Sequence, residues 1–207
     1  PDVLAVPGYV RAARYKAFPG DRSFEQEYLA LYELEVEDLD ALQAVSDEHM
    51  RRIEADEMHR SPPETIDRDN VRSMYFAETG PRLGGHDDVP ETLFMPFTEP
   101  VSEEDDEEFN RWYQKVHLPE VLDVPGFSAA SRYKETGMNM TGRPWPINCP
   151  YLALYELGDG TKEAFDNAMK ELRRRISEGD RMEISETLGS DKITQVYSRI
   201  TDRIAAT

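Results

Sequence analysis

One histidine of this chain could carry proton-transfer chemistry. His117 follows apolar residues that are spaced as one helical face across 109–116, and Pro119 stands two positions after it. The dipole at the C-terminal end of a helix favours a charged imidazole, and histidine can titrate near neutral pH, as acid–base catalysis requires. A histidine that only caps the helix would occupy the same place, so the residue type leaves both roles open.

Arginine and tyrosine stand side by side at two places, Arg132-Tyr133 and Arg14-Tyr15. An arginine on a strand that is covered from both sides needs a partner or a ligand anion. Its planar guanidinium could hold a substrate carboxylate through two hydrogen bonds, while the tyrosine could hold a developing enolate oxygen. A glutamate on the neighbouring strand is the structural alternative, Glu156 for Arg132 and Glu33 for Arg14.

Further aromatic and polar side chains could line a binding pocket for a flat, apolar ligand. The candidates are Asn110, Tyr113, Trp145, Tyr151, Tyr155, Tyr28 and Tyr32. Trp145 belongs to a proline-rich loop that could form a lid or simply cover an edge. Packing in the core is the structural alternative for the tyrosines, so the sequence predicts a pocket wall without assigning roles.

Other reactive arrangements do not occur. His49 and His59 are ten positions apart, which excludes the spacing of a helical zinc motif, and His86 stands with two aspartates in a glycine-rich segment. No glycine-rich nucleotide motif and no nucleophile elbow are present, and Cys149 has no adjacent base. We therefore expect no metal site, no cofactor and no covalent nucleophile.

The elements that position these residues are repeated within the chain. The heptapeptide YLALYEL occurs at 28–34 and again at 151–157. Upstream, residues 1–16 and 119–134 are identical at ten of sixteen positions. An internal repeat of about 120 residues is the size of a domain rather than of a solenoid unit. The sequence therefore predicts two copies of one unit.

The second copy has the order strand, helix, strand, strand, helix, strand, which is the ferredoxin-like unit. The strands are expected at 91–97, 127–134, 151–157 and 192–204, and the helices at 102–118 and 162–178. Ser102, followed by Asp105, has the pattern of a helix start, and Pro119 or Pro125 ends the helix.

The first copy repeats the later part of that order. Strands are expected near 8–16, 28–34 and 71–83, with a helix at 36–59 and a loop at 60–70. No first strand and first helix stand before them, so we expect about 25–30 residues to precede this sequence, with a degenerate copy as the alternative. The glycine-rich segment 80–90 marks a boundary between units 1–85 and 86–207.

Two such units would cover each other. A four-stranded sheet with both helices on one side leaves its other face bare, and that face must be buried. The YLALYEL strands carry apolar residues on both faces, as a doubly covered strand does. We therefore expect an α+β pseudo-dimer whose two ferredoxin-like sheets pack against each other around a small apolar chamber.

The residues HLPEVLDVPGF and SRYK, after a helix carrying FNRWYQKVH, resemble the dimeric α/β-barrel superfamily, and within it the EthD-like proteins. The resemblance covers both copies. It implies a cavity bordered by the helix-distal face of each sheet and by the end of the first helix, which points to His117. Members include cofactor-free monooxygenases, muconolactone-type isomerases, haem-binding enzymes and stress-response domains, so the fold alone does not select a function.

The composition restricts the partners. The formal net charge is −18, which disfavours nucleic acid and anionic lipid as partners. A single cysteine and the lack of a long apolar run suit a soluble protein of the cytoplasm. A small-molecule substrate, and a possible homodimer of pseudo-dimers, are the partners that we expect.

Two functions of different classes remain. The first is a cofactor-independent isomerase or lyase, and less readily an oxygenase, in which His117 transfers a proton on a small cyclic or aromatic metabolite. The second is a barrel that binds a ligand without catalysis, as in stress-response proteins. A haem-binding variant would use His117 as the axial ligand.

Overall fold

The structure is a computed structural model that describes residues 2–20, 24–58, 65–85, 90–180, 182–202 and 204–206. His59, the residues His86 to Asp88 and the first part of the expected loop 60–70, residues 60–64, lie outside these ranges. The elements in the first part of the chain are η1 (Val3–Ala5), β1 (Tyr9–Ala17), β2 (Tyr28–Leu34), α1 (Leu39–Glu54), η2 (Arg68–Asn70), β3 (Phe76–Glu78) and β4 (Leu83–Gly84). Those in the second part are β5 (Thr92–Pro100), α2 (Asp106–Trp112), the π-helical segment η3 (Tyr113–His117), α3 (Leu118–Leu122), β6 (Phe127–Glu135), β7 (Tyr151–Leu157), α4 (Lys162–Glu178), β8 (Leu188–Arg199) and β9 (Ile204–Ala205).

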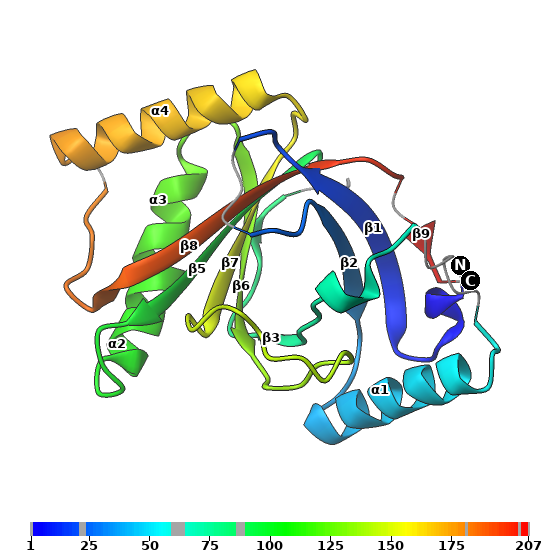
Figure 1. Ribbon diagram of the computed structural model, residues 1–207. Coiled ribbons are helices and arrows are strands. Elements are labelled where there is room, and N and C mark those ends of the chain that lie inside the picture. Colours follow the sequence, from blue (N-terminus) through cyan, green and yellow to red (C-terminus); the bar gives the residue numbers. More distant parts are fainter. Residues whose placement is uncertain are drawn as a thin grey trace.

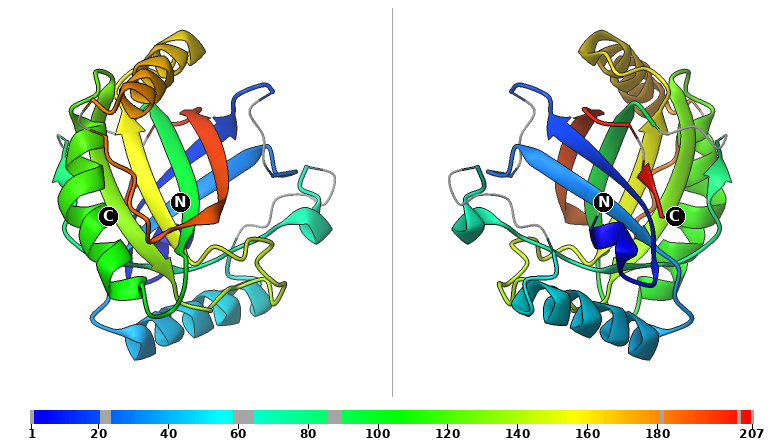
Figure 2. Two further views of the ribbon diagram at one scale, coloured as in Figure 1. Left: turned by 90° about the vertical axis from the view of Figure 1, so that its left-hand side faces the viewer. Right: turned by 90° about the vertical axis from the view of Figure 1, so that its right-hand side faces the viewer.

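The strands form one strongly curled antiparallel sheet in the order β2-β1-β8-β5-β7-β6-β3 (Figures 1 and 2). Strands β5 to β8 lie side by side in the order β8-β5-β7-β6. Along the chain, helices follow β5 and β7, which agrees with the expected ferredoxin-like order. Strand β1 extends this sheet along β8, and β3 extends it along β6. The α+β class is therefore confirmed, with one continuous sheet in place of two separate ones.

The helices lie on the outer face of the sheet. Figure 1 shows α2, α3 and α4 over β5 to β8, and α1 at the other end of the molecule. A hydrophobic cluster lies between the helices and this outer face. It contains Phe109 of α2, Leu118 of α3, Phe165 of α4 and Tyr155 of β7. In α4, the buried positions Phe165, Ala168 and Leu172 follow helical spacing, Thr161 caps the start, and Gly179 ends the helix in a left-handed conformation.

Side chains also fill the inner face of the curl. Leu93, Phe97, Leu152 and Leu154 pack there with residues of β1 and β8. The loop before β7 adds Trp145, whose ring lies 5.9 to 6.5 Å from the rings of Phe24, Phe76 and Phe97. The expected apolar chamber inside the barrel is thus occupied by packed aromatic and aliphatic side chains in the region that these residues line.

The repeated Pro-Gly step needs glycine at both of its positions. Gly8 and Gly126 have φ of +99° and +106°, a region that side chains with a Cβ rarely adopt, and each directly precedes a strand. A Cβ on Gly8 would lie 2.6 Å from Val45 Cγ2. The turn that aims β1 and β6 into the sheet thus follows from the local sequence.

Several expected boundaries are corrected. The first helix of the second half begins at Asp106 rather than Ser102, because the Ser102 hydroxyl bonds the Asp105 side chain within a preceding turn. Helix α1 is shorter than expected. The strand expected at 71–83 is reduced to the short strands β3 and β4, which pair with β6.

Candidate functional site

Arg132 is the centre of a buried polar cluster between α2 and the sheet. It is 1% exposed, and its guanidinium carbon lies 4.0 Å from the ring centroid of Tyr113 and 5.0 Å from those of Phe109 and Tyr151. Nη1 donates to Asn110 Oδ1 at 2.8 Å. Burial lowers the pKa of Arg132, but an arginine stays protonated in proteins. A charge is therefore held in an aromatic cage on the outer face of the sheet.

The cage leaves donors of Arg132 unused. Among the described residues, Nε and Nη2 have no hydrogen-bond partner although both atoms are buried. The Nδ1 atom of His117 is in the same state. The hydroxyls of Tyr155 and Thr98 lie within reach of the Tyr113 phenol. Unsatisfied buried polar groups are rare because each costs free energy, and they are common where a ligand or water completes them. The grouping of such unsatisfied polar atoms distinguishes this region from an ordinary hydrophobic core.

Tyr113 connects the members of this cluster. Its ring contacts Arg132 and also lies 4.9 Å from the His117 ring in an edge-on arrangement. Burial raises the pKa of Tyr113 and of Tyr155, so both phenols are neutral donors at neutral pH. The Tyr113 ring is therefore in contact with both the buried cation of Arg132 and the imidazole of His117.

His117 is uncharged at neutral pH. Burial, followed by the charges of Arg132 and Lys192, lowers the pKa of His117 to about 4. Its ring stacks on Trp112 at 4.8 Å. The expectation that a helix dipole would favour the charged form is wrong, because the helical path continues through α3 to Leu122 instead of ending at Pro119. A neutral imidazole can accept a proton, which is the form that a base requires.

The helix changes its winding at these residues. Segment η3 is π-helical over Tyr113–His117, directly between α2 and α3. Single π-turns within α-helices occur frequently at functional sites, because the wider turn places neighbouring side chains where regular winding would not. In this chain, the two residues at its ends are the two that meet in the cluster.

A hydrogen-bond chain leads from Arg132 to the surface. Asn110 Nδ2 donates to the Tyr151 hydroxyl at 2.9 Å, and that hydroxyl donates to Asp106 Oδ1 at 2.6 Å. Lys134 Nζ lies 3.9 Å from the same carboxylate and 4.9 Å from the Tyr151 ring centroid. The buried cation is therefore connected to a solvent-facing ion pair.

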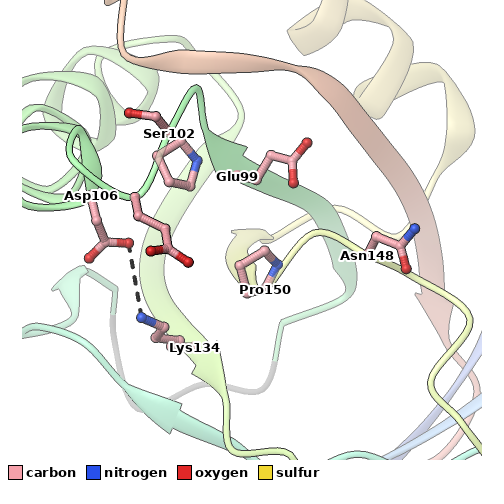
Figure 3. Close-up of a pocket in the computed structure, with 8 residues that line it drawn as sticks. Glu99, Ser102, Asp106, Lys134, Asn148 and Pro150 are labelled. Atoms are coloured by element: carbon pink, nitrogen blue, oxygen red, sulfur yellow. Dashed lines mark ion pairs between the residues drawn. The ribbon is translucent and has the colours of Figure 1, made fainter.

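That ion pair lines a surface hollow of about 600 Å³. Figure 3 shows Asp106 and Lys134 pointing towards each other across it, with Glu99 and Pro150 on the opposite side. The lining residues are Glu99, Pro100, Ser102, Glu103, Asp106, Lys134, Asn148 and Pro150. The hollow is the approach from solvent to the hydrogen-bond chain.

The structure divides the predicted site residues into three groups. His117, Arg132, Asn110, Tyr113, Tyr151 and Tyr155 meet on the outer face of the second half. Tyr133, Tyr15 and Trp145 belong to the inner core cluster. Arg14, Tyr28 and Tyr32 are exposed on the outer side of β1 and β2.

The predicted glutamate partners bond other residues. Glu156 forms an ion pair with Arg82 at 2.7 Å, and Glu33 forms one with Arg11 at 3.4 Å. Arg132 instead donates a hydrogen bond to Asn110. The separation of Arg132 from Tyr133 follows from strand geometry, since consecutive side chains point to opposite faces. The same rule places Lys134 beside Arg132, a signal that sequence reasoning missed. Thr98 and Asp106 were also missed.

No metal cluster is present in the described ranges: nowhere in them do three or more His, Cys, Asp or Glu side chains gather as a metal site would need. No helix in the part of the chain that the structure describes is long and apolar enough to cross a membrane.

Comparison with known proteins identifies the fold. No family model matches the sequence, and no curated protein matches it. The crystal structure of an anthrone oxidase-like protein superposes with a TM-score of 0.51 at 15% identity, covering 99% of this chain and 82% of that one. The chain has a ferredoxin-like α+β fold.

Two further solved structures are more distant. A putative monooxygenase from Lactobacillus acidophilus NCFM has a TM-score of 0.45 at 12% identity, covering 97% of this chain and 83% of that one. A ferredoxin fold protein related to antibiotic biosynthesis monooxygenases from Listeria monocytogenes has a TM-score of 0.40 at 11% identity, covering 96% of this chain and 99% of that one.

Proposed function

We propose that this protein is a cofactor-independent enzyme that transfers a proton on a small, largely apolar cyclic or aromatic carbonyl compound. The observation that carries the proposal is Arg132, which is 1% exposed and keeps two donors without a partner among the described residues. Donors fixed in a buried site stabilise an oxygen that becomes negative during a reaction more strongly than water does. The neutral His117, whose ring lies 4.9 Å from that of Tyr113, supplies the base.

The roles follow from the protonation states. His117 Nδ1 accepts the proton from the carbon next to the carbonyl group, and the electron pair moves to the carbonyl oxygen. Arg132, with the neutral phenol of Tyr155, holds the resulting enolate. Returning the proton to another carbon completes an isomerisation, and expulsion of a neighbouring group completes a lyase reaction. Tyr133 takes no part, since it packs on the inner face.

Oxygenation is a second outcome of the same enolate. A stabilised carbanion can react with molecular oxygen without a cofactor, and the fold relatives include an anthrone oxidase-like protein and a putative monooxygenase. Because identity to these proteins is low, their names support the fold and only suggest the substrate class. The common step, removal of a proton next to a carbonyl, is the part that this site explains.

The architecture that we propose is a tandem pseudo-dimer of the EthD-like type, with units at 1–85 and 86–207. Three matches support it: the repeated YLALYEL strands, the paired Pro-Gly turns with positive φ, and a helix after each of the repeated strands. The pairing of β1 with β8 and of β3 with β6 joins the two units at both ends of the second one. Among the described residues, Arg14, the counterpart of Arg132, is exposed, so the cluster around Arg132 has no equivalent around Arg14.

Hydrogen–deuterium exchange tests the chemistry without knowledge of the product. Anthrone and simple cyclic ketones are incubated with the protein in D₂O, and NMR follows loss of the proton next to the carbonyl. We expect catalysed exchange that falls at least about 100-fold in His117→Ala and Arg132→Met, in the range expected for loss of a general base or an oxyanion donor. Tyr133→Phe is the matched control and retains activity.

The same samples separate the alternatives. Oxygen consumption by an electrode identifies an oxygenase, whereas exchange without oxygen uptake identifies an isomerase or lyase. Tight binding of the ketones with no exchange in any variant would contradict the enzyme and favour the ligand-binding protein. A Soret band that depends on His117 after addition of haem would assign that residue to haem instead.

A further inference from the structure

The two copies of YLALYEL lie in different environments. In β7 every residue is buried, whereas in β2 no residue is fully buried, and exposed and partly buried residues alternate from Tyr28 to Tyr32. Tyr151 and Tyr155 are 2% and 1% exposed, but the corresponding Tyr28 and Tyr32 are 53% and 37% exposed. Because the two heptapeptides are identical, the difference comes entirely from what covers each strand. Large aromatic side chains exposed together on one face mark an interaction surface.

Strand β2 also has an open edge. Strand β7 lies between β5 and β6, but β2 pairs only with β1 in the sheet that the described residues form. Ala17 N–H donates to Glu27 C=O at 2.8 Å, and antiparallel pairing alternates along a strand. The backbone groups of Tyr28, Ala30 and Tyr32 therefore point away from β1. An edge of this kind is a template for another strand.

The charges beside this edge repeat those of the candidate site. Arg14 and Lys16 in β1 correspond to Arg132 and Lys134 in β6, which meet Asn110 and Asp106 at the start of α2. Arg14 is exposed, and Lys16 lies 5.3 Å from the Tyr28 ring centroid and 3.3 Å from Glu27. A helix that begins with acidic and amide side chains would complement this pair.

We propose that the outer face and free edge of β2 form a docking site for a polypeptide segment consisting of a strand and a following amphipathic helix. The strand adds to β2 through backbone hydrogen bonds, and the helix covers Tyr28 and Tyr32 with its aromatic stripe. The segment Thr92–Leu122 performs both tasks for β7 within this chain, so it defines the chemistry of the occupant. Strand addition to an exposed edge is a general mode of peptide recognition.

The proposal does not depend on the proposed enzyme activity. The occupant would, however, bring a polar helix start over Arg14, as α2 does over Arg132. Docking would therefore assemble a second cluster of the same composition as the first, around Arg14, Tyr28 and Tyr32.

A synthetic peptide with the sequence of residues 90–123, labelled with a fluorophore, is the probe. We expect saturable binding to the 207-residue protein in the micromolar range by fluorescence anisotropy. Hydrogen exchange of the Tyr28, Ala30 and Tyr32 amides should slow when the peptide is bound. A peptide with aspartate in place of Leu93 and Met95, whose side chains face the inner core, is the control that should not bind.

Two variants of the protein locate the binding. Ala30→Pro removes an N–H on the free edge and leaves the bonds to β1 intact, and Tyr28→Ser removes an exposed ring. We expect each to weaken binding about tenfold or more. Both variants are checked for folding by circular dichroism, and Tyr28→Ser decides the matter if Ala30→Pro is unfolded. Absence of saturable binding, equal affinity in the variants, or amide protection confined to other strands would overturn the proposal.

Discussion

Strands β2 and β7 carry the same heptapeptide, so the effect of burial on stability can be measured with little difference in local sequence. Replacing Tyr151 or Tyr28 with alanine changes the same residue in the same heptapeptide, so strand propensity and the six residues that follow are equal in both variants. Tyr151 is 2% exposed, donates a hydrogen bond to Asp106 and accepts one from Asn110. Tyr28 is 53% exposed and contacts Lys16. Apart from the preceding residue, Glu27 or Pro150, the two positions differ in their tertiary environment.

The magnitudes follow from burial. Loss of a fully buried aromatic side chain costs about 3–5 kcal/mol, and the lost hydrogen bonds place Tyr151→Ala in the upper half of that range. Because about half of Tyr28 is already in water, its removal should cost only about 1–2 kcal/mol. We therefore expect the free energy of unfolding to differ by about 2–4 kcal/mol between the two variants.

Urea unfolding measures this difference. Tryptophan fluorescence and circular dichroism should give the same transition, which establishes two-state behaviour, and the slope with urea should match among the variants. Equal losses of stability in Tyr151→Ala and Tyr28→Ala would refute the argument that burial separates the two strands. A larger loss for Tyr28→Ala would show that β2 is covered in solution.

Three further predictions concern single residues. The pKa of His117 is about 4 in the folded protein and about 6.5 in the unfolded chain. Between about pH 6.5 and about pH 4, the unfolded chain therefore binds a proton that the folded protein does not. The contribution of the neutral His117 to the free energy of unfolding is thus full above about pH 6.5 and is lost towards about pH 4. Comparison of urea unfolding at pH 7 and pH 4.5 should therefore show a smaller loss in His117→Gln than in the parent, by about 1–2 kcal/mol after allowance for partial exposure; an identical loss would contradict the buried, neutral imidazole. Arg132→Met should change stability by less than about 1 kcal/mol while activity is lost, because an apolar side chain suits the aromatic cage; strong destabilisation in urea would instead assign Arg132 a structural role. Gly8→Ala should cost about 1–3 kcal/mol, since φ is +99° and its Cβ would meet Val45, whereas Gly20→Ala, with open space around it, should cost less; equal midpoints of thermal unfolding would be inconsistent with this.

Most of the secondary structure could be predicted because it depends on local patterns. The helix at 162–178 has the expected bounds, since its apolar spacing, its threonine cap and its terminal glycine all belong to neighbouring residues. The prediction of one strand at 71–83 was wrong because strand formation there depends on residues that are remote in the sequence. Its pairing partner β6 is remote in sequence, and the apolar letters at 71–75 are only half-buried coil.

The site was predicted in part. Helical spacing brought Asn110, Tyr113 and His117 to one region, and the repeated tyrosines pointed to β7. The face was wrong: the inner side of the curl is packed, and the cluster lies under the helices. The π-turn at Tyr113–His117 has no local sequence signal, although Pro125 is one of the two expected helix ends. The pKa of His117 is lowered by burial and by the charges of Arg132 and Lys192, which depend on tertiary packing.

The sequence by itself determined the repeat, the order of strands and helices, and the glycines at the paired turns, because these depend on residue spacing and on backbone sterics within a few positions. Only the tertiary structure decided that one copy of YLALYEL is buried while the other is half exposed, and that Arg132 keeps donors without a partner among the described residues. Burial and desolvation depend on segments remote in the chain, so seven identical letters acquire two different environments.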